Sequence, residues 1–217
     1  GRITFLLPSR GNTPVGGFKV VYEYANRFAA DGYVTTLVYP ATLPLKRQSV
    51  CDFIRMLLRF LRLNQRCHYS GNSWFKFHPE VIEKWVPSFD FIFFDKEEII
   101  VASACETAWW LINNKKVVRN KKFYLIQHYE NWVDNEILVK TWKSGLHKIV
   151  IADWLYRIGS DFGVKTDLIE NGLDHQSFYL KVNITDRINT SVCMLWHISE
   201  NKGSNDGLKA LIQVKKE

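Results

Sequence analysis

The stretch PVGGFKVVYEYANRFAA, residues 14–30, decides the fold of this chain. Apolar side chains recur in it at three- and four-residue spacing, which predicts an amphipathic helix from about residue 17 to residue 31. The apolar run 3–7 before it predicts a strand buried on both faces, and the run 34–39 after it predicts a second strand. The chain therefore opens with a strand–helix–strand unit that carries a glycine pair where the helix begins.

The glycine pair, Gly16 and Gly17, lies where a ligand could approach the backbone closely, because glycine has no Cβ atom. The first N–H groups of a helix have no partner within the helix and carry the positive end of its dipole, so phosphate is the usual ligand there. The spacing matches neither the GxGxxG fingerprint nor the P-loop pattern. Two interpretations stay open: the pair binds a phosphate group, or it only lets the loop turn sharply.

Strand-like and helical segments alternate along the rest of the chain, which predicts an α/β fold with a doubly wound parallel, Rossmann-like sheet. Further strands are expected at 99–104, 123–126, 147–152 and 166–169, and further helices at 106–114, 135–144 and 154–162. The segments 80–85 and 89–94 are expected to form a short helix and a strand. Ligands of such sheets bind beyond the carboxyl ends of the strands.

A polar stretch near residues 180–191 divides the chain. We expect a Rossmann-like domain over 1–178, a linker over 179–190, and the opening strand and helix of a second domain over 191–217. One strand and one helix cannot form a core by themselves. The chain is therefore expected to be the N-terminal part of a longer protein.

The net charge of +7 and the pI of about 9.2 favour anionic partners such as nucleotides or lipid headgroups. Nucleic acid is the least expected of them, because the basic residues are not interleaved with aromatic residues as in a known module. No membrane span or signal-peptide pattern is present, so we expect a cytoplasmic protein. No close pair of His, Cys, Asp or Glu has metal-ligand spacing, so we expect no metal site.

Four arginines share one face of the helix expected over 49–66; they are Arg55, Arg59, Arg62 and Arg66. Only Asp52 offers a local countercharge. Two interpretations stay open for this basic amphipathic helix. It packs on the core and leaves its arginines in water, or it binds an anionic membrane surface as a peripheral anchor.

Several polar side chains follow the expected strands. His128 comes at the end of a strand, where an imidazole can donate to a hydroxyl or a phosphate oxygen. Arg10, Glu106 and Glu130 are candidate contacts to an acceptor or a sugar. Lys202, before Gly203 at a strand-to-helix turn, is typical of a phosphate contact. Taken alone, a histidine or a glutamate in such a position is more often structural or solvent-exposed, and Lys202 is equally compatible with a plain surface position.

Six blocks of the chain, in this order, resemble the nucleotide-sugar glycosyltransferases of family four, and the resemblance covers nearly all of it. They are PVGGFKVVYEYANRFAADGYVTTLVYP (14–40), VASACETAWWLIN (101–113), KFYLIQHYE (122–130), IADWLYRIGSDFG (151–163), IENGLDHQSF (169–178) and MLWHISENKGSNDGLKAL (194–211). The family has the GT-B architecture of two Rossmann-like domains, which implies that this chain is its N-terminal half and the start of the other. The resemblance is nearest to members that transfer rhamnose or build polysaccharides.

The resemblance implies a retaining hexosyl- or rhamnosyltransferase that uses a nucleotide-diphosphate sugar and no metal or other cofactor. Its acceptor would be a glycan or a lipid-linked glycan in cell-surface polysaccharide synthesis, at the inner face of the membrane. It assigns Gly16 and Gly17 to the donor diphosphate, His128 to the donor sugar as the catalytic residue, and Lys202 to the diphosphate.

The chain departs from the family pattern in its last part. Trp196 and His197 stand where the family has Gly-Arg, so a second diphosphate cation is in doubt. The glutamate pair that binds ribose and sugar in the family would lie beyond Glu217, so we expect this chain alone to be weakly active or inactive. Two alternatives stay open: a non-catalytic nucleotide- or glycan-binding module of Rossmann type, and another GT-B enzyme such as a sugar-nucleotide epimerase.

Overall fold

The computed structural model describes residues 1–10, 13–43, 50–66, 74–188, 191–197 and 202–214, with the side chains of 52 and 54–62 in the helix 50–66. The chain divides into two compact units, Gly1–Asn171 and Gly172–Glu217, and each is described by itself. No helix in these described ranges is long and apolar enough to cross a membrane.

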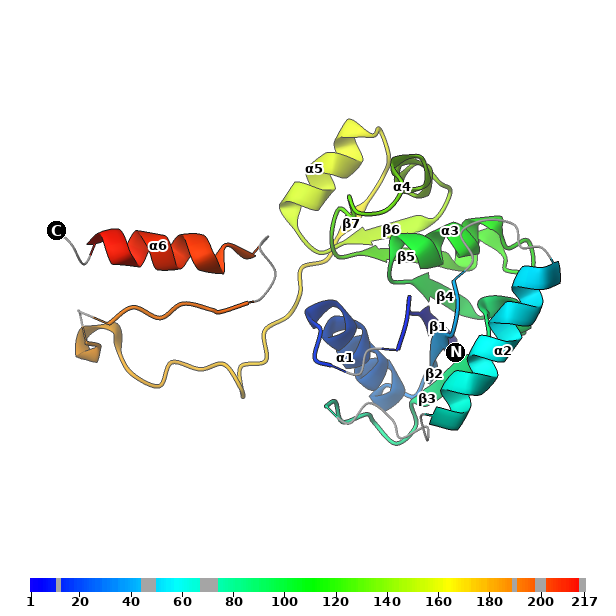
Figure 1. Ribbon diagram of the computed structural model, residues 1–217, viewed down its shortest axis with the longest axis horizontal. Helices are drawn as coiled ribbons and strands as arrows, with labels where there is room; N and C mark the ends of the chain where they lie inside the picture. The colour runs from blue at the N-terminus through cyan, green and yellow to red at the C-terminus, as the bar shows by residue number, and fades with distance from the viewer. Residues whose placement is uncertain (11–12, 44–49, 67–73, 189–190, 198–201, 215–217) are drawn as a thin grey trace. The chain divides into compact units, whose positions relative to one another are not determined.

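The first unit is built on a seven-stranded parallel sheet with the strand order β3-β2-β1-β4-β5-β6-β7 (Figure 1). The strands are β1 (Arg2–Leu6), β2 (Val34–Pro40), β3 (Ile82–Val86), β4 (Ile99–Ala102), β5 (Lys122–Ile126), β6 (His147–Val150) and β7 (Asp167–Leu168). The helices are α1 (Gly16–Ala30), α2 (Val50–Arg66), α3 (Cys105–Asn113), α4 (Asn135–Trp142) and α5 (Asp153–Asp161). This arrangement confirms the predicted doubly wound α/β fold.

The sheet is covered on both faces because the apolar residues of its central strands alternate in direction. Ile3 and Phe5 of β1 belong to a cluster with Tyr22 of α1, whereas Leu6 belongs to the cluster formed with α3, α4 and α5. The chain order reverses at β1, which has β2 on one side and β4 on the other. The loops that follow β1 and β4 therefore leave toward opposite faces, and this is where doubly wound sheets bind ligands.

Two local predictions for the first unit are wrong. The segment predicted as a helix over 80–85 contains β3, which pairs with β2 from Thr36↔Ile82 to Pro40↔Val86. Pairing with a neighbouring strand outweighs local helix preference there. The segment 89–94 is not a strand: it begins with a 3-10 turn, Phe89–Phe91, whose start is fixed by the Ser88 hydroxyl accepting the Asp90 N–H at 3.2 Å.

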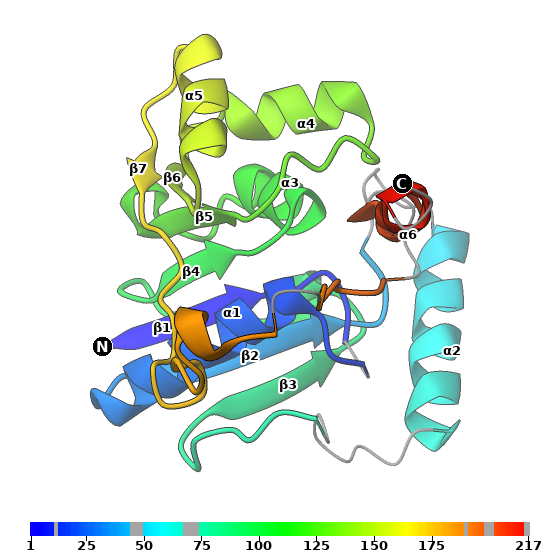
Figure 2. The same ribbon diagram turned by 90° about the vertical axis from the view of Figure 1, so that its left-hand side faces the viewer.

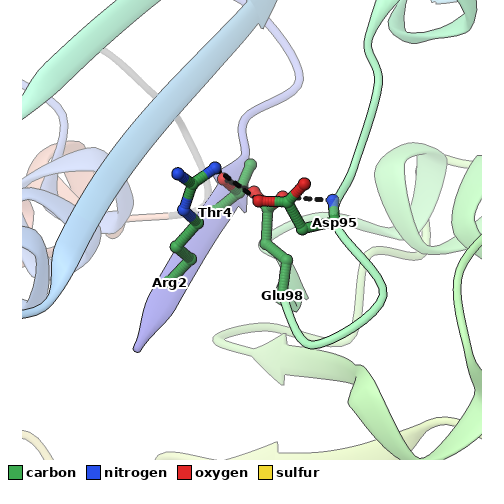
Figure 3. Close-up of polar contacts among 4 residues, drawn as sticks. All are labelled: Arg2, Thr4, Asp95 and Glu98. Carbon is green, nitrogen blue, oxygen red and sulfur yellow. Dashed lines mark hydrogen bonds and ion pairs between the residues drawn. The ribbon is translucent and has the colours of Figure 1, made fainter.

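A polar cluster near the amino ends of β1 and β4 ties the loop before β4 to β1 (Figure 3). The Thr4 hydroxyl donates to Oε1 of Glu98 at 2.5 Å, and the Asp95 N–H donates to Oε2 of Glu98 at 2.9 Å. Arg2 forms an ion pair with Asp95. Thr4 and Glu98 are both buried, so their hydrogen bond replaces contacts with water that the unfolded chain would make.

We expect Thr4→Val to lower the free energy of unfolding by about 1.5 kcal/mol, because the buried Glu98 carboxylate loses a donor. Thr36→Val is the matched control, since Thr36 lies opposite Thr4 in the register and its hydroxyl bonds to no other described residue. This control is expected to be neutral or stabilising. Urea denaturation measures both variants, and an equal loss in the two would contradict the role assigned to the Thr4–Glu98 bond.

The second unit carries one longer helix, α6 (Ser204–Val214), where a helix was expected, and a short 3-10 turn, Ile184–Asp186. The strand expected over 191–196 is not found: the described residues 191–197 are assigned no strand. A strand needs the backbone hydrogen bonds of a neighbouring strand, and the described part of this unit offers none.

Candidate functional site

The start of α1 and the end of β5 meet at the carboxyl edge of the sheet. The side-chain Nε2 of Gln127 donates to the backbone oxygen of Gly17 at 3.1 Å. Gln127 directly precedes His128 in the chain. The two features singled out in the sequence, the glycine pair and the histidine, therefore share one edge of the first unit.

The backbone at the glycine pair is open, and its conformation does not require glycine. Neither Gly16 nor Gly17 has a positive φ angle. A Cβ atom on Gly16 would meet no atom within 4 Å, and one on Gly17 would come no closer than 3.6 Å to Gln127. Val15, the residue before the helix, makes no side-chain cap, and the first turn holds no acidic residue. A sharp turn thus gives no reason for glycine here, whereas the free N–H groups suit an anion.

The imidazole of His128 is exposed and packs against two tryptophans that were not predicted as site residues. Its ring centre is 5.2 Å from that of Trp132 and 5.7 Å from that of Trp154. Trp132 is 67% exposed and Trp154 46% exposed, so their faces are available to a ligand. Exposed aromatic faces beside a hydrogen-bonding group suit the flat, partly apolar face of a sugar or a base.

Glu130 is buried and caps α3 from within the protein. Its Oε2 accepts the N–H of Cys105, the first residue of α3, at 2.9 Å. Burial and, to a smaller extent, the neighbouring Glu106 carboxyl raise the pKa of Glu130 to about 7, against the opposing effect of the Cys105 N–H. The structure thus gives Glu130 an internal partner, and its predicted contact to an acceptor or a sugar stays a prediction, as does that of Glu106.

The rest of the α3 start is also satisfied internally. The Thr107 hydroxyl accepts the N–H groups of Ser103 at 3.1 Å and Ala104 at 3.0 Å. Burial raises the pKa of the Cys105 thiol to about 12, so this cysteine stays protonated and unreactive at neutral pH. Of these two helix starts, α1 is the one whose first turn offers donors to a ligand.

Arg10, in the loop after β1, lies near the pair formed by Tyr39 and Glu83. The Tyr39 hydroxyl bonds Glu83 Oε1 at 3.0 Å. Burial raises the pKa of Glu83, while the Tyr39 hydroxyl and the Arg10 guanidinium act in the opposite direction. Arg10 therefore has an electrostatic role within the fold, and its contact to an acceptor or a sugar stays a prediction.

Lys202 is exposed next to Gly203, whose φ of +68° allows the turn into α6. It belongs to the second unit, so its predicted contact with the diphosphate stays a prediction.

Within the described ranges, no three His, Cys, Asp or Glu side chains lie together as a metal ion would require. Comparison with known protein families, curated proteins and solved structures finds no match to the chain. Function is therefore inferred from the arrangement of these residues.

Proposed function

We propose that the chain binds a nucleotide-diphosphate sugar at the carboxyl edge of its first unit. In this proposal it is part of a retaining glycosyltransferase whose acceptor is a glycan or a lipid-linked glycan of cell-surface polysaccharide synthesis. One observation carries the proposal: the uncapped first turn of α1 at Gly16 and Gly17 is joined through Gln127 to the strand end that carries His128. A helix start with free N–H groups and no nearby acid favours a diphosphate.

The chemistry follows from what each group can donate. The N–H groups at Gly16 and Gly17 stabilise the negative charge that grows on the diphosphate as the sugar leaves, and they are already fixed in place. The imidazole of His128 donates to a hydroxyl of the sugar, and the exposed faces of Trp132 and Trp154 stack against it. Lys202 is proposed as a further cation for the diphosphate. Retention of the anomeric configuration is proposed from the family resemblance alone.

Amide chemical shifts test the proposal. The chain is titrated with a nucleoside diphosphate and with nucleotide-diphosphate sugars up to millimolar concentration, where weak binding is visible. We expect the amide signals of Gly16 and Gly17 to move with both kinds of ligand, and the ring signals of His128 to move with them when the ligand carries a sugar. Shifts confined to other parts of the chain, or none at all, would contradict the proposal. Ligand binding without sugar transfer by the full-length protein would favour the non-catalytic module instead.

His128→Ala separates the sugar from the diphosphate. We expect it to weaken binding of a nucleotide-diphosphate sugar about fivefold, because one hydrogen bond to the sugar is lost, and to leave binding of the nucleoside diphosphate unchanged. His147→Ala is the matched control, since His147 is exposed at the start of β6, at the opposite end of the strands. Equal weakening of both ligands by His128→Ala would show that the imidazole does not contact the sugar.

A further inference from the structure

Part of the apolar surface of α2 is not covered by the rest of the first unit. Met56 is buried, and Phe60 stacks on Trp85 of β3 with ring centres 6.1 Å apart. On another side of the helix, three aliphatic residues with the spacing of one helical ridge are about half exposed: Ile54 at 52%, Leu58 at 49% and Leu61 at 54%. We call them the aliphatic ridge.

An arginine row lies directly beside the aliphatic ridge. Arg55, Arg59 and Arg62 are exposed and, at about 100° per residue, fall on the next strip of the helix surface. Arg55 is 3.5 Å from Asp52, whereas Arg59 and Arg62 have no acidic partner within ion-pair distance among the described residues. The predicted arginine face is thus present for three of its four members, and the side chain of Arg66 lies outside the described part.

We propose that α2 docks on an anionic lipid bilayer, with the aliphatic ridge inserted between the headgroups and the arginine row bound to their phosphates. A basic row beside an apolar strip on one helix is the arrangement of helices that lie in the membrane interface. Nucleic acid fits less well, because its phosphates would bind the arginines but leave the aliphatic ridge in water. The charge of the row selects bilayers that contain anionic lipid.

The position of α2 agrees with such a surface. Phe60 of α2 stacks on Trp85, the second-to-last residue of β3. α2 therefore lies at the carboxyl edge of the sheet (Figure 2). On the proposed function, a bilayer there would present a lipid-linked acceptor at the edge that holds Gly16 and His128. The docking itself needs no transfer activity, so its test is independent of the proposed function.

Flotation with vesicles tests the docking on the full chain. We expect binding to vesicles of phosphatidylcholine mixed with phosphatidylglycerol and little binding to phosphatidylcholine alone. Combined Arg55→Gln, Arg59→Gln and Arg62→Gln should lower partitioning about fivefold for each charge removed. The matched control removes three exposed charges elsewhere, by Lys115→Gln, Lys165→Gln and Lys181→Gln, and should bind nearly as well as the wild-type chain.

Leu58→Ser with Leu61→Ser tests insertion separately from charge. Both residues are half exposed, so the fold should tolerate the change, and partitioning into the mixed vesicles should fall at least tenfold. Undiminished vesicle binding by this variant would overturn the insertion. An equal loss in the lysine control and the arginine variant, or tighter binding to single-stranded RNA than to the mixed vesicles, would overturn the docking of the arginine row on the bilayer.

Discussion

Glu130→Gln should leave the chain more stable than wild type above pH 7, by up to about 3 kcal/mol, and equally stable near pH 4. The folded chain raises the pKa of Glu130 from 4.5 to about 7, chiefly through burial. As the pH rises from 4.5 to 7, the unfolded state therefore loses this proton before the folded state does, and stability falls. Glutamine has no proton to lose, and its amide oxygen can still accept the Cys105 N–H.

Urea denaturation at pH 4.5, 6 and 8 measures this difference, with 4.5 and 7 as the bounds set by the pKa values of the unfolded and folded states. Glu80→Gln is the matched control, because Glu80 is exposed and makes the same chemical change at the surface. The wild-type chain and this control should lose stability in parallel toward pH 8, while Glu130→Gln should not. An identical pH dependence of all three proteins would show that Glu130 ionises freely in the folded state.

The sequence predicts the central elements because their apolar pattern is strong. The helical period of residues 14–30 and the apolar runs of β1 and β2 leave little ambiguity, and each is found within one or two residues of its expected bounds. β3 is missed because it is an edge strand whose residues are exposed or half buried, so it lacks a continuous apolar run. Its pairing with β2 is a long-range contact that no local pattern encodes.

From the sequence, the candidate site can be placed only at the carboxyl edge of the sheet, without its contacts. Ligands bind beyond the carboxyl ends of parallel strands, so the sequence alone predicts that Gly17 and His128 lie at the same edge of the sheet. The contact of Gln127 with Gly17 joins residues 110 positions apart, and only the fold reveals it. Trp132 and Trp154 follow two neighbouring strands, β5 and β6, and this position after a strand end was the available signal.

The burial of Glu130 also separates two helix starts that look alike in sequence. Both α1 and α3 follow a central strand, so by position either helix start could hold an anion. In α3 the protein supplies its own acceptor, the Glu130 carboxyl, and the Thr107 hydroxyl accepts two further N–H groups. The first turn of α1 has no such side-chain cap, and this difference directs the strongest test of the proposed ligand to Gly16.

Gly16→Leu is expected to weaken binding of a nucleoside diphosphate about 100-fold, through the loss of one or two charge-assisted hydrogen bonds to the helix start. The side chain has room in the protein, because a Cβ atom on Gly16 meets no atom within 4 Å and the φ angle is not positive. Stability should therefore change little, or rise slightly because the unfolded chain loses freedom. Calorimetric titration gives the affinity, and urea denaturation gives the free energy of unfolding of the variant.

Ala30→Leu is the matched control for this variant, because it adds a leucine at an exposed position at the other end of the same helix. It should bind the nucleoside diphosphate as the wild-type chain does. Undiminished binding by Gly16→Leu would mean that no diphosphate approaches the backbone at the start of α1, since the open space seen there would then be filled without consequence. A loss of affinity that accompanies a loss of stability would instead indicate that glycine is needed by the fold, against the geometry of the residue.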